Sequence, residues 1–153
     1  MSQLELRVPP PIVALLAGLL MWFAAKALPA LGFHVPARAA LAGAIGFLGL
    51  LLGAIAFFQF RRVGTTPNPL KPYDITMLVV NGVYRRSRNP MYLGDALILI
   101  AWALWLANAA AFLGLPLFVV YLNRFQIAAE ERALQSRFGA AYVDYCQRVR
   151  RWV

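Results

Sequence analysis

The chain has 153 residues, of which 61% are hydrophobic and 14% are charged, and its formal net charge is +9. A soluble domain is about half apolar and about a quarter charged, so this composition argues against an ordinary soluble protein. The apolar residues fall into four blocks, with most charges between and after them, as a bilayer requires because a charge at mid-membrane is costly. The basic residues flank these blocks and form no soluble basic domain, which argues against nucleic-acid binding.

Two long apolar blocks open the chain. Residues 11–33 and 37–60 are each long enough to cross a bilayer, which takes about 20 residues. Within the second block, Gly49 and Gly53 form a GxxxG pair, a spacing that lets another helix approach closely. Residues 61–90 follow as a polar stretch rich in proline and glycine, which predicts a loop.

The second half of the chain contains two shorter apolar blocks and a polar tail. Residues 91–107 and 110–127 are joined near Asn108, and so tight a turn predicts a helical hairpin. Residues 128–153 are amphipathic, because an apolar stripe recurs at helical spacing at Leu134, Phe138, Tyr142, Tyr145 and Val149. Gly139 is the expected break between two helices of this tail. The sequence therefore predicts an all-α polytopic membrane bundle. It forms one membrane domain with four transmembrane helices and an amphipathic, helical C-terminal segment.

Basic residues are concentrated in two of the connections. The first connection has only Arg38 nearby, and the turn at Asn108 has none. The positive-inside rule therefore places the loop at residues 61–90, the tail and both termini in the cytoplasm. The basic residues on that side are Arg61, Arg62, Lys71, Arg85, Arg86, Arg88, Arg124, Arg132, Arg137, Arg148, Arg150 and Arg151.

The predicted hairpin brings the start of the third block beside the end of the fourth, and polar residues occur at both places. Arg88 precedes the third block, while Glu130 and Glu131 follow the fourth. A carboxylate there can hold an ammonium or ribose hydroxyls, the arginine can hold a carboxylate, and Tyr84 and Tyr92 can pack against a ring. This combination suits a zwitterionic nucleoside such as S-adenosylmethionine. A nucleotide, a phospholipid headgroup or purely structural ion pairs fit the same spacing, so these alternatives stay open.

Three stretches of this sequence resemble one known family. GVYRRSRNPMYLG, at residues 82–94, resembles the signature GxYxxxRHPxYxG of membrane-bound isoprenylcysteine carboxyl methyltransferases. RRVGTTPNPLKP, at residues 61–72, is similar to the linker of their bacterial relatives, and EERALQSRFGAAYVDYCQRVRRW, at residues 130–152, is similar to the ending EExxLxxxFGxxYxxYxxxVxR. Phospholipid N-methyltransferases and membrane sterol reductases are similar in the same region, so the superfamily is better indicated than the substrate.

The resemblance implies a methyltransferase of the bacterial inner membrane that uses S-adenosylmethionine and releases S-adenosylhomocysteine. Its implied partners are membrane lipids and a lipophilic or lipid-linked, isoprenoid-like acceptor, and no metal is expected. Asp95 is a further catalytic candidate, because an ionisable residue inside an apolar block suggests function, although pairing with a nearby arginine is an equal alternative. The candidate catalytic residues are therefore Arg88, Glu130 and Asp95, and the implied cofactor-binding residues are Tyr84, Arg88, Asn89, Pro90, Tyr92, Gly94, Glu130 and Glu131.

One position departs from the family pattern. Asn89 stands where the family often has histidine, and the only histidine, His34, is predicted on the opposite side of the membrane. A carboxylate acceptor needs no base, whereas an ammonium must first lose a proton to a glutamate, a tyrosine or water. The sequence therefore favours O-methylation of a carboxylate. The alternatives are phospholipid N-methylation, an NADPH-dependent membrane reductase of the sterol-reductase kind, and a membrane scaffold without enzymatic activity.

Overall fold

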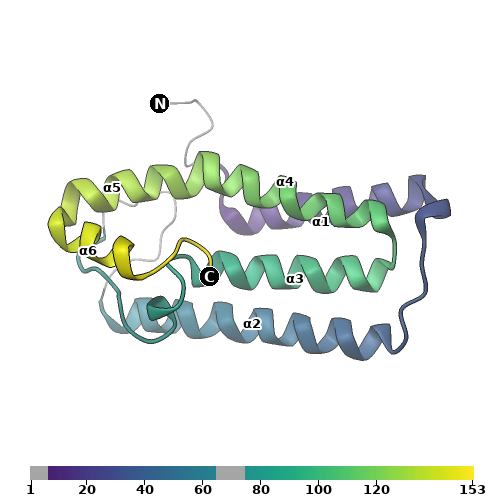
Figure 1. Cartoon of the computed structure of the whole chain (residues 1–153), viewed down its shortest axis with the longest axis horizontal. Helices are drawn as coiled ribbons and strands as arrows, with labels where there is room; N and C mark the ends of the chain where they lie inside the picture. The colour runs from purple at the N-terminus through teal and green to yellow at the C-terminus, as the bar shows by residue number, and fades with distance from the viewer. Residues whose placement is uncertain (1–6, 65–74) are drawn as a thin grey trace.

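The computed structural model describes residues 7–64 and 75–153, so residues 65–74 of the predicted loop lie outside the described ranges. The predicted all-α class is confirmed (Figure 1). The helices are α1 (Pro10–Ala27), α2 (Arg38–Arg62), α3 (Pro90–Leu106), α4 (Gly114–Tyr121), α5 (Ala128–Phe138) and α6 (Ala140–Arg148). Short 3₁₀ turns occupy Pro29–Leu31, Gly82–Arg85 and Ala109–Leu113.

Prolines mark both ends of the first helix, one in its first turn and one shortly after its last residue. Pro10 occupies the first turn of α1, where a missing backbone N–H costs nothing. The helix ends at Ala27, earlier than the apolar block at residues 11–33, because Pro29 starts a 3₁₀ turn. Apolar composition therefore overstates the length of this helix, since it does not register the change of backbone conformation.

The fourth apolar block does not end as a helix at residue 127. A π-helical turn, Leu122–Ile127, joins α4 to α5, so the helical path continues through Phe138. Together with α1 and α2, the stretch Ala109–Phe138 is long and apolar enough to cross a membrane, while α3 is apolar but only 17 residues long. Residues 7–64 and 75–153 thus contain three long candidate membrane spans and one shorter apolar helix, where the sequence predicts four transmembrane helices.

Helix α3 lies inside the bundle and touches α2 at a glycine pair. In Figure 1 it lies between α2 on one side and the α1 and α4 pair on the other. A Cβ atom added to Gly94 would lie 2.7 Å from the carbonyl oxygen of Gly49, and one added to Gly49 would lie 2.7 Å from that of Gly94. The two backbones are therefore in direct contact. The predicted role of Gly49 in close helix packing is borne out by this contact.

The connections at one end of the bundle are held together by Asn108. Its Oδ1 accepts a hydrogen bond from the Ala110 backbone N–H at 2.9 Å, and its Nδ2 donates to the Leu28 carbonyl at 2.8 Å. The Phe33 N–H donates to the Ala107 carbonyl at 2.9 Å. The hairpin turn is thereby fastened to the end of α1.

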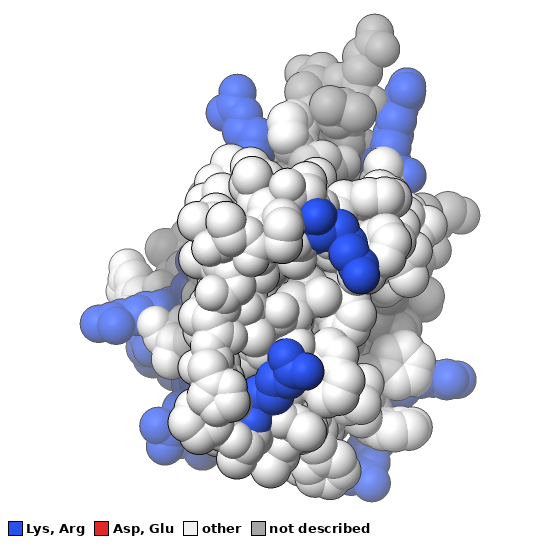
Figure 2. Space-filling view, turned by 90° about the vertical axis from the view of Figure 1, so that its right-hand side faces the viewer, with Lys and Arg blue, Asp and Glu red and all other residues white. Residues whose placement is uncertain are grey.

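Basic side chains at this same end stack on aromatic rings. The Lys26 ammonium lies 5.9 Å from the Trp22 ring centroid, and the Arg38 guanidinium lies 5.7 Å from that of Trp105. Figure 2 looks onto this end, and the visible face is largely uncharged, with scattered basic side chains and no acidic one in view. Tryptophan and basic residues together are typical of a membrane–water interface.

At the opposite end, the chain turns back after Gly139, which has a φ of +51° and separates α5 from α6 as predicted. The apolar stripe of the tail forms a small core of its own, in which Tyr142, Tyr145 and Val149 are buried against Leu134 and Phe138. This fold places α6 and the C-terminus beside the start of α3 (Figure 1).

Candidate functional site

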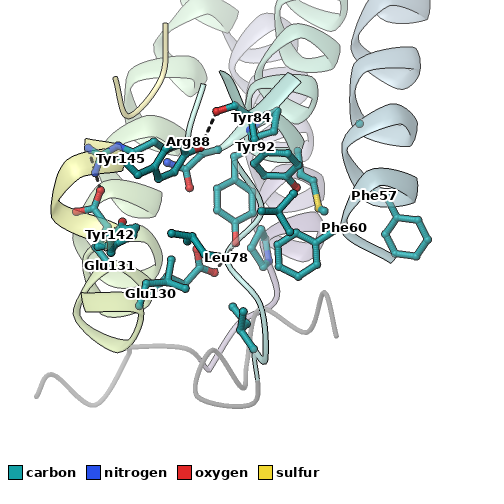
Figure 3. Close-up of a pocket in the computed structure, with 18 of the residues that line it drawn as sticks. Phe57, Phe60, Leu78, Tyr84, Arg88, Tyr92, Glu130, Glu131, Tyr142 and Tyr145 are labelled. Atoms are coloured by element: carbon teal, nitrogen blue, oxygen red, sulfur yellow. Dashed lines mark hydrogen bonds and ion pairs between the residues drawn. The ribbon is translucent and has the colours of Figure 1, made fainter. Parts of the chain in front are cut away.

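A cavity of about 410 Å³ opens at the end of the bundle where α3 begins and the chain passes from α5 into α6. Its volume lies within the range of roughly 300–1,000 Å³ that is common for small-molecule sites. Figure 3 shows Arg88, Glu130 and Glu131 toward α5 and α6, and Phe57 and Phe60 on the opposite side. The cavity therefore has one polar side and one apolar side.

The polar side contains a carboxylate held by two neutral donors. The Tyr92 hydroxyl donates to Glu130 Oε1 at 2.5 Å, and Gln126 Nε2 donates to the same oxygen at 2.6 Å. Gln126 belongs to the π-helical turn, and it is almost fully buried. Neither donor carries a charge, so these two hydrogen bonds hold Glu130 in position without pairing it to a cation.

The second carboxylate lies between two guanidinium groups. Arg151 donates to Glu131 through Nε at 3.0 Å and through Nη2 at 2.6 Å, which is a bidentate pair. Arg88 approaches the same carboxylate less closely, with Nη2 3.3 Å from Oε1. The Nε of Arg88 is buried and has no hydrogen-bond partner among the described residues.

The apolar side is built mainly from the C-terminal half of α2 and from the chain before the 3₁₀ turn. Pro10 and Pro11 of α1 also reach the cavity, so this wall includes residues of two candidate membrane spans. Among the residues that the structure describes, no charged one contributes to this wall. The residues of this wall are Pro10, Pro11, Gly53, Phe57, Phe60, Ile75, Met77, Leu78 and Val79.

Three tyrosines close the cavity between these two sides. The Tyr145 hydroxyl donates to the Tyr84 carbonyl at 2.7 Å, and the Tyr84 hydroxyl donates to the Ala56 carbonyl at 3.3 Å. Burial raises the pKa of the Tyr84, Tyr142 and Tyr145 phenols above the ordinary value. At neutral pH these phenols are therefore protonated and cannot serve as proton-accepting phenolates.

Eight of the nine site residues proposed from the sequence line this one cavity. Asp95 is among them, and it makes no ion pair with an arginine within residues 7–64 and 75–153. Gly94 does not line the cavity and instead packs on Gly49. The eight lining residues are Tyr84, Arg88, Asn89, Pro90, Tyr92, Asp95, Glu130 and Glu131.

Asn89 lines the cavity, but its side chain has a structural bond. Its Nδ2 donates to the Arg151 carbonyl at 2.9 Å, and the Arg88 backbone N–H donates to the Arg150 carbonyl at 3.0 Å. The end of the chain therefore supports the segment that carries Arg88. The amide donor of Asn89 is accordingly used by the protein itself.

The sequence reasoning did not single out several residues of the site. Tyr142 and Tyr145 were assigned only to the apolar stripe of the tail, and Arg151 only to the basic side of the membrane. Phe57 and Phe60 of α2 also line the cavity, yet in the sequence they look like any lipid-facing residues. Only Tyr142, Tyr145 and Arg151 had a usable signal, because they occupy defined positions in the tail motif.

The donor set of the cavity fits the zwitterionic end of S-adenosylmethionine. Glu130 and Glu131 offer carboxylates for an ammonium or for ribose hydroxyls, and the unpartnered Arg88 Nε offers a donor for a carboxylate. Within the described part of the chain, no cluster of three or more His, Cys, Asp and Glu side chains is arranged to hold a metal ion. The arrangement can thus hold a charged nucleoside at one side and an apolar molecule at the other.

Comparison with known proteins identifies the family. The profile of the family described as phospholipid methyltransferase matches residues 37–141, more than half of the chain. An uncharacterized protein of Haemophilus influenzae is 54% identical over 63 residues, which are 41% of this chain and all of that protein. No solved structure matches significantly.

Two further relatives are named for an enzymatic activity. Protein-S-isoprenylcysteine O-methyltransferase B of Arabidopsis thaliana is 29% identical over 102 residues, which are 67% of this chain and 52% of that protein. Delta(14)-sterol reductase of Mus musculus is 28% identical over 116 residues, which are 65% of this chain and 28% of that protein. The chain thus spans about half the length of the first and about a quarter of the second. It is an integral membrane protein that belongs to the phospholipid methyltransferase family.

Proposed function

We propose that the protein is a membrane methyltransferase that transfers a methyl group from S-adenosylmethionine to a carboxylate on a lipophilic, isoprenoid-like acceptor. The observation that carries this proposal is the two-sided cavity. Its polar side combines Arg88, Glu130 and Glu131, and its apolar side comes partly from α1 and α2, which are long enough to span a membrane. A charged nucleoside and a lipid-borne acceptor can therefore meet inside one cavity.

Bound S-adenosylmethionine would supply an electrophilic methyl group whose sulfonium is its own leaving group. The protein then has to bind the cofactor and the acceptor, orient them towards each other, and exclude water from the site. Glu130, held by Tyr92 and Gln126, would hold the ammonium or ribose hydroxyls, and the Arg88 Nε would hold a carboxylate. Catalysis by this chain would thus rest on alignment, which does not call for a strong base.

The described residues that line the cavity include no histidine or lysine that could accept a proton, which favours a carboxylate acceptor. The Asn89 amide is bonded to the Arg151 carbonyl, and the raised pKa values of Tyr84 and Tyr145 keep both phenols protonated. A carboxylate oxygen is already an anionic nucleophile at neutral pH. The named activity of the plant relative, an O-methyltransferase, is compatible with this choice.

Phospholipid N-methylation is the second candidate function, and the description of the matching family favours it. An amine acceptor would have to lose a proton, and Asp95 is the lining carboxylate best suited to accept it, since it makes no ion pair with an arginine of the described ranges. A reductase using NADPH is the third, motivated by the similarity to the mouse sterol reductase.

One labelling experiment distinguishes these functions. We would incubate purified protein with methyl-labelled S-adenosylmethionine and total membrane lipids, and then treat the labelled product with mild alkali. The proposal predicts base-labile label, because a methyl ester is hydrolysed and a methylated amine is not. Alkali-stable label on a phospholipid amine would favour N-methylation. Absence of labelling, together with NADPH binding by titration calorimetry, would favour the reductase.

We also propose that the chain crosses the membrane four times, with α3 as the shortest crossing and with both termini in the cytoplasm. The basic loop, the tail and the cavity would then face the cytoplasm, where S-adenosylmethionine is made available. The short 17-residue α3 is compatible with this arrangement, because it lies inside the bundle and a little-tilted helix crosses with fewer residues. A bacterial inner membrane is the proposed location.

The orientation of the chain in the membrane can be measured by labelling variants that each contain a single cysteine. Cys146 is the only native cysteine, so a Cys146→Ser background leaves no other thiol. A cysteine at His34 is expected to react with a membrane-impermeant maleimide added to intact cells, while a cysteine at the exposed Asp144 is expected to react only after lysis. Equal labelling of both positions in intact cells would contradict the proposed orientation.

A further inference from the structure

We infer that Arg151 is a positioning residue that keeps Glu131 from neutralising Arg88, so that Arg88 stays available to a carboxylate ligand. This inference rests on the proposed function, because the ligand would be a carboxylate of the cofactor or of the acceptor. It assigns a role to Arg151, which the tail motif includes as a matching position only.

The distances show which arginine holds Glu131 more tightly. Arg151 uses two nitrogens on the two carboxylate oxygens, at 3.0 and 2.6 Å, whereas Arg88 reaches only one oxygen, at 3.3 Å. A parallel, two-bond pair is the stronger and more directional arrangement. The hydrogen bonds that Arg151 donates to Glu131 also raise the pKa of the Arg151 guanidinium. Glu131 is therefore held primarily by Arg151.

Arg88, Arg151 and Glu131 form a triad of charged side chains in which the positive charge of Arg88 is the less compensated one. Two guanidinium groups share one carboxylate, so one positive charge is not compensated within the triad. Arg88 is also the more enclosed arginine, with 15% of its side chain exposed against 38% for Arg151. Its Nε is buried without a partner among the described residues. A buried, unpartnered donor is costly unless a ligand satisfies it, and a carboxylate is the matching ligand.

The backbone near Arg151 supports the same geometry. The Arg150 carbonyl accepts from the Arg88 N–H at 3.0 Å, and the Arg151 carbonyl accepts from Asn89 Nδ2 at 2.9 Å. The next residue, Trp152, donates from its indole to Asn123 Oδ1 at 3.1 Å. Since Asn123 lies in the π-helical turn, the backbone that carries Arg151 is anchored on both sides of this residue, which limits where its guanidinium can hold Glu131.

Two matched pairs of ligands test the inference in the full-length protein in detergent. S-adenosylhomocysteine carries the amino-acid carboxylate that 5′-methylthioadenosine lacks, and S-farnesylcysteine carries the carboxylate that its carboxamide lacks. Calorimetry would measure the dissociation constant of each compound for the wild type, Arg151→Gln and Arg148→Gln. Arg148 is an exposed arginine of α6 that does not line the cavity, so its variant controls for the loss of one positive charge.

In Arg151→Gln, the Glu131 carboxylate is expected to turn to Arg88 and neutralise it. The preference for the carboxylate ligand in one pair should then fall about tenfold, while Arg148→Gln keeps it. If the preference falls in the nucleoside pair, the carboxylate that Arg88 binds belongs to the cofactor. If it falls in the farnesyl pair, that carboxylate belongs to the acceptor. If Arg151→Gln fails to fold, Arg151→Lys decides. Arg151→Lys keeps the positive charge without the bidentate contact, and the preference for the carboxylate ligand is expected to fall about threefold.

Three results would overturn the inference. Unchanged preferences in both pairs would show that Arg151 does not influence Arg88. An equal loss in Arg148→Gln would show that only the general positive charge matters. A wild type that binds neither nucleoside would remove the proposed function and the inference with it, whereas the first two results leave the proposed function intact.

Discussion

Replacing Glu130 by glutamine is expected to lower the kcat/KM of methyl transfer about 100-fold, which corresponds to about 2.7 kcal/mol of lost transition-state stabilisation. The substitution keeps the shape of the side chain, and an amide oxygen can still accept from Tyr92 and Gln126. It replaces an ionisable carboxylate that lines the cavity with a neutral amide. Initial rates with labelled S-adenosylmethionine, and the dissociation constant of S-adenosylhomocysteine, would measure the effect.

The control for this variant is Asp144→Asn. Asp144 is an exposed acidic residue of α6 that does not line the cavity, so its loss changes the net charge equally without touching the site. It should retain the wild-type rate. A Glu130→Gln protein with wild-type affinity and rate would mean that Glu130 has only a structural role, and the polar side of the cavity would lose its main assigned ligand contact.

The second large effect is expected on stability. In Gly94→Ala the new methyl group would lie 2.7 Å from the Gly49 carbonyl oxygen, so α2 and α3 must separate. Overpacking of this kind costs roughly 1–3 kcal/mol. Because α2 supplies Phe57 and Phe60 while α3 begins at the polar side, separation also widens the cavity. A lower melting temperature in detergent, accompanied by reduced activity, is the expected result.

Gly43→Ala is the matched control for the glycine substitution. Gly43 also lies in α2, and a Cβ atom added there meets no other group within 4 Å. Alanine is the better helix former, by about 1 kcal/mol relative to glycine in a helix interior, so this variant should be as stable as the wild type or more stable. Equal destabilisation by both substitutions would contradict the close contact between Gly94 and Gly49.

The amino-acid sequence by itself determined the helical class, the positions of the apolar blocks and the candidate polar residues. These features depend on local composition, because a bilayer excludes charge from any apolar segment wherever it lies in the fold. The sequence also placed residues near 88–92 close to residues 130–131, since a tight hairpin turn brings the two ends of its helices together. The cavity lining agrees with that placement.

Only the tertiary structure decided which of these residues face the cavity and which support it. Gly94 belongs to the same motif as Tyr92, but it contacts α2, because two positions along a helix point to different sides. Asn89 is bonded to the Arg151 carbonyl, 62 residues further along the chain. The Arg151–Glu131 pair and the π-helical turn that carries Gln126 likewise arise from long-range packing or from a single extra residue per turn, and composition and spacing do not encode either.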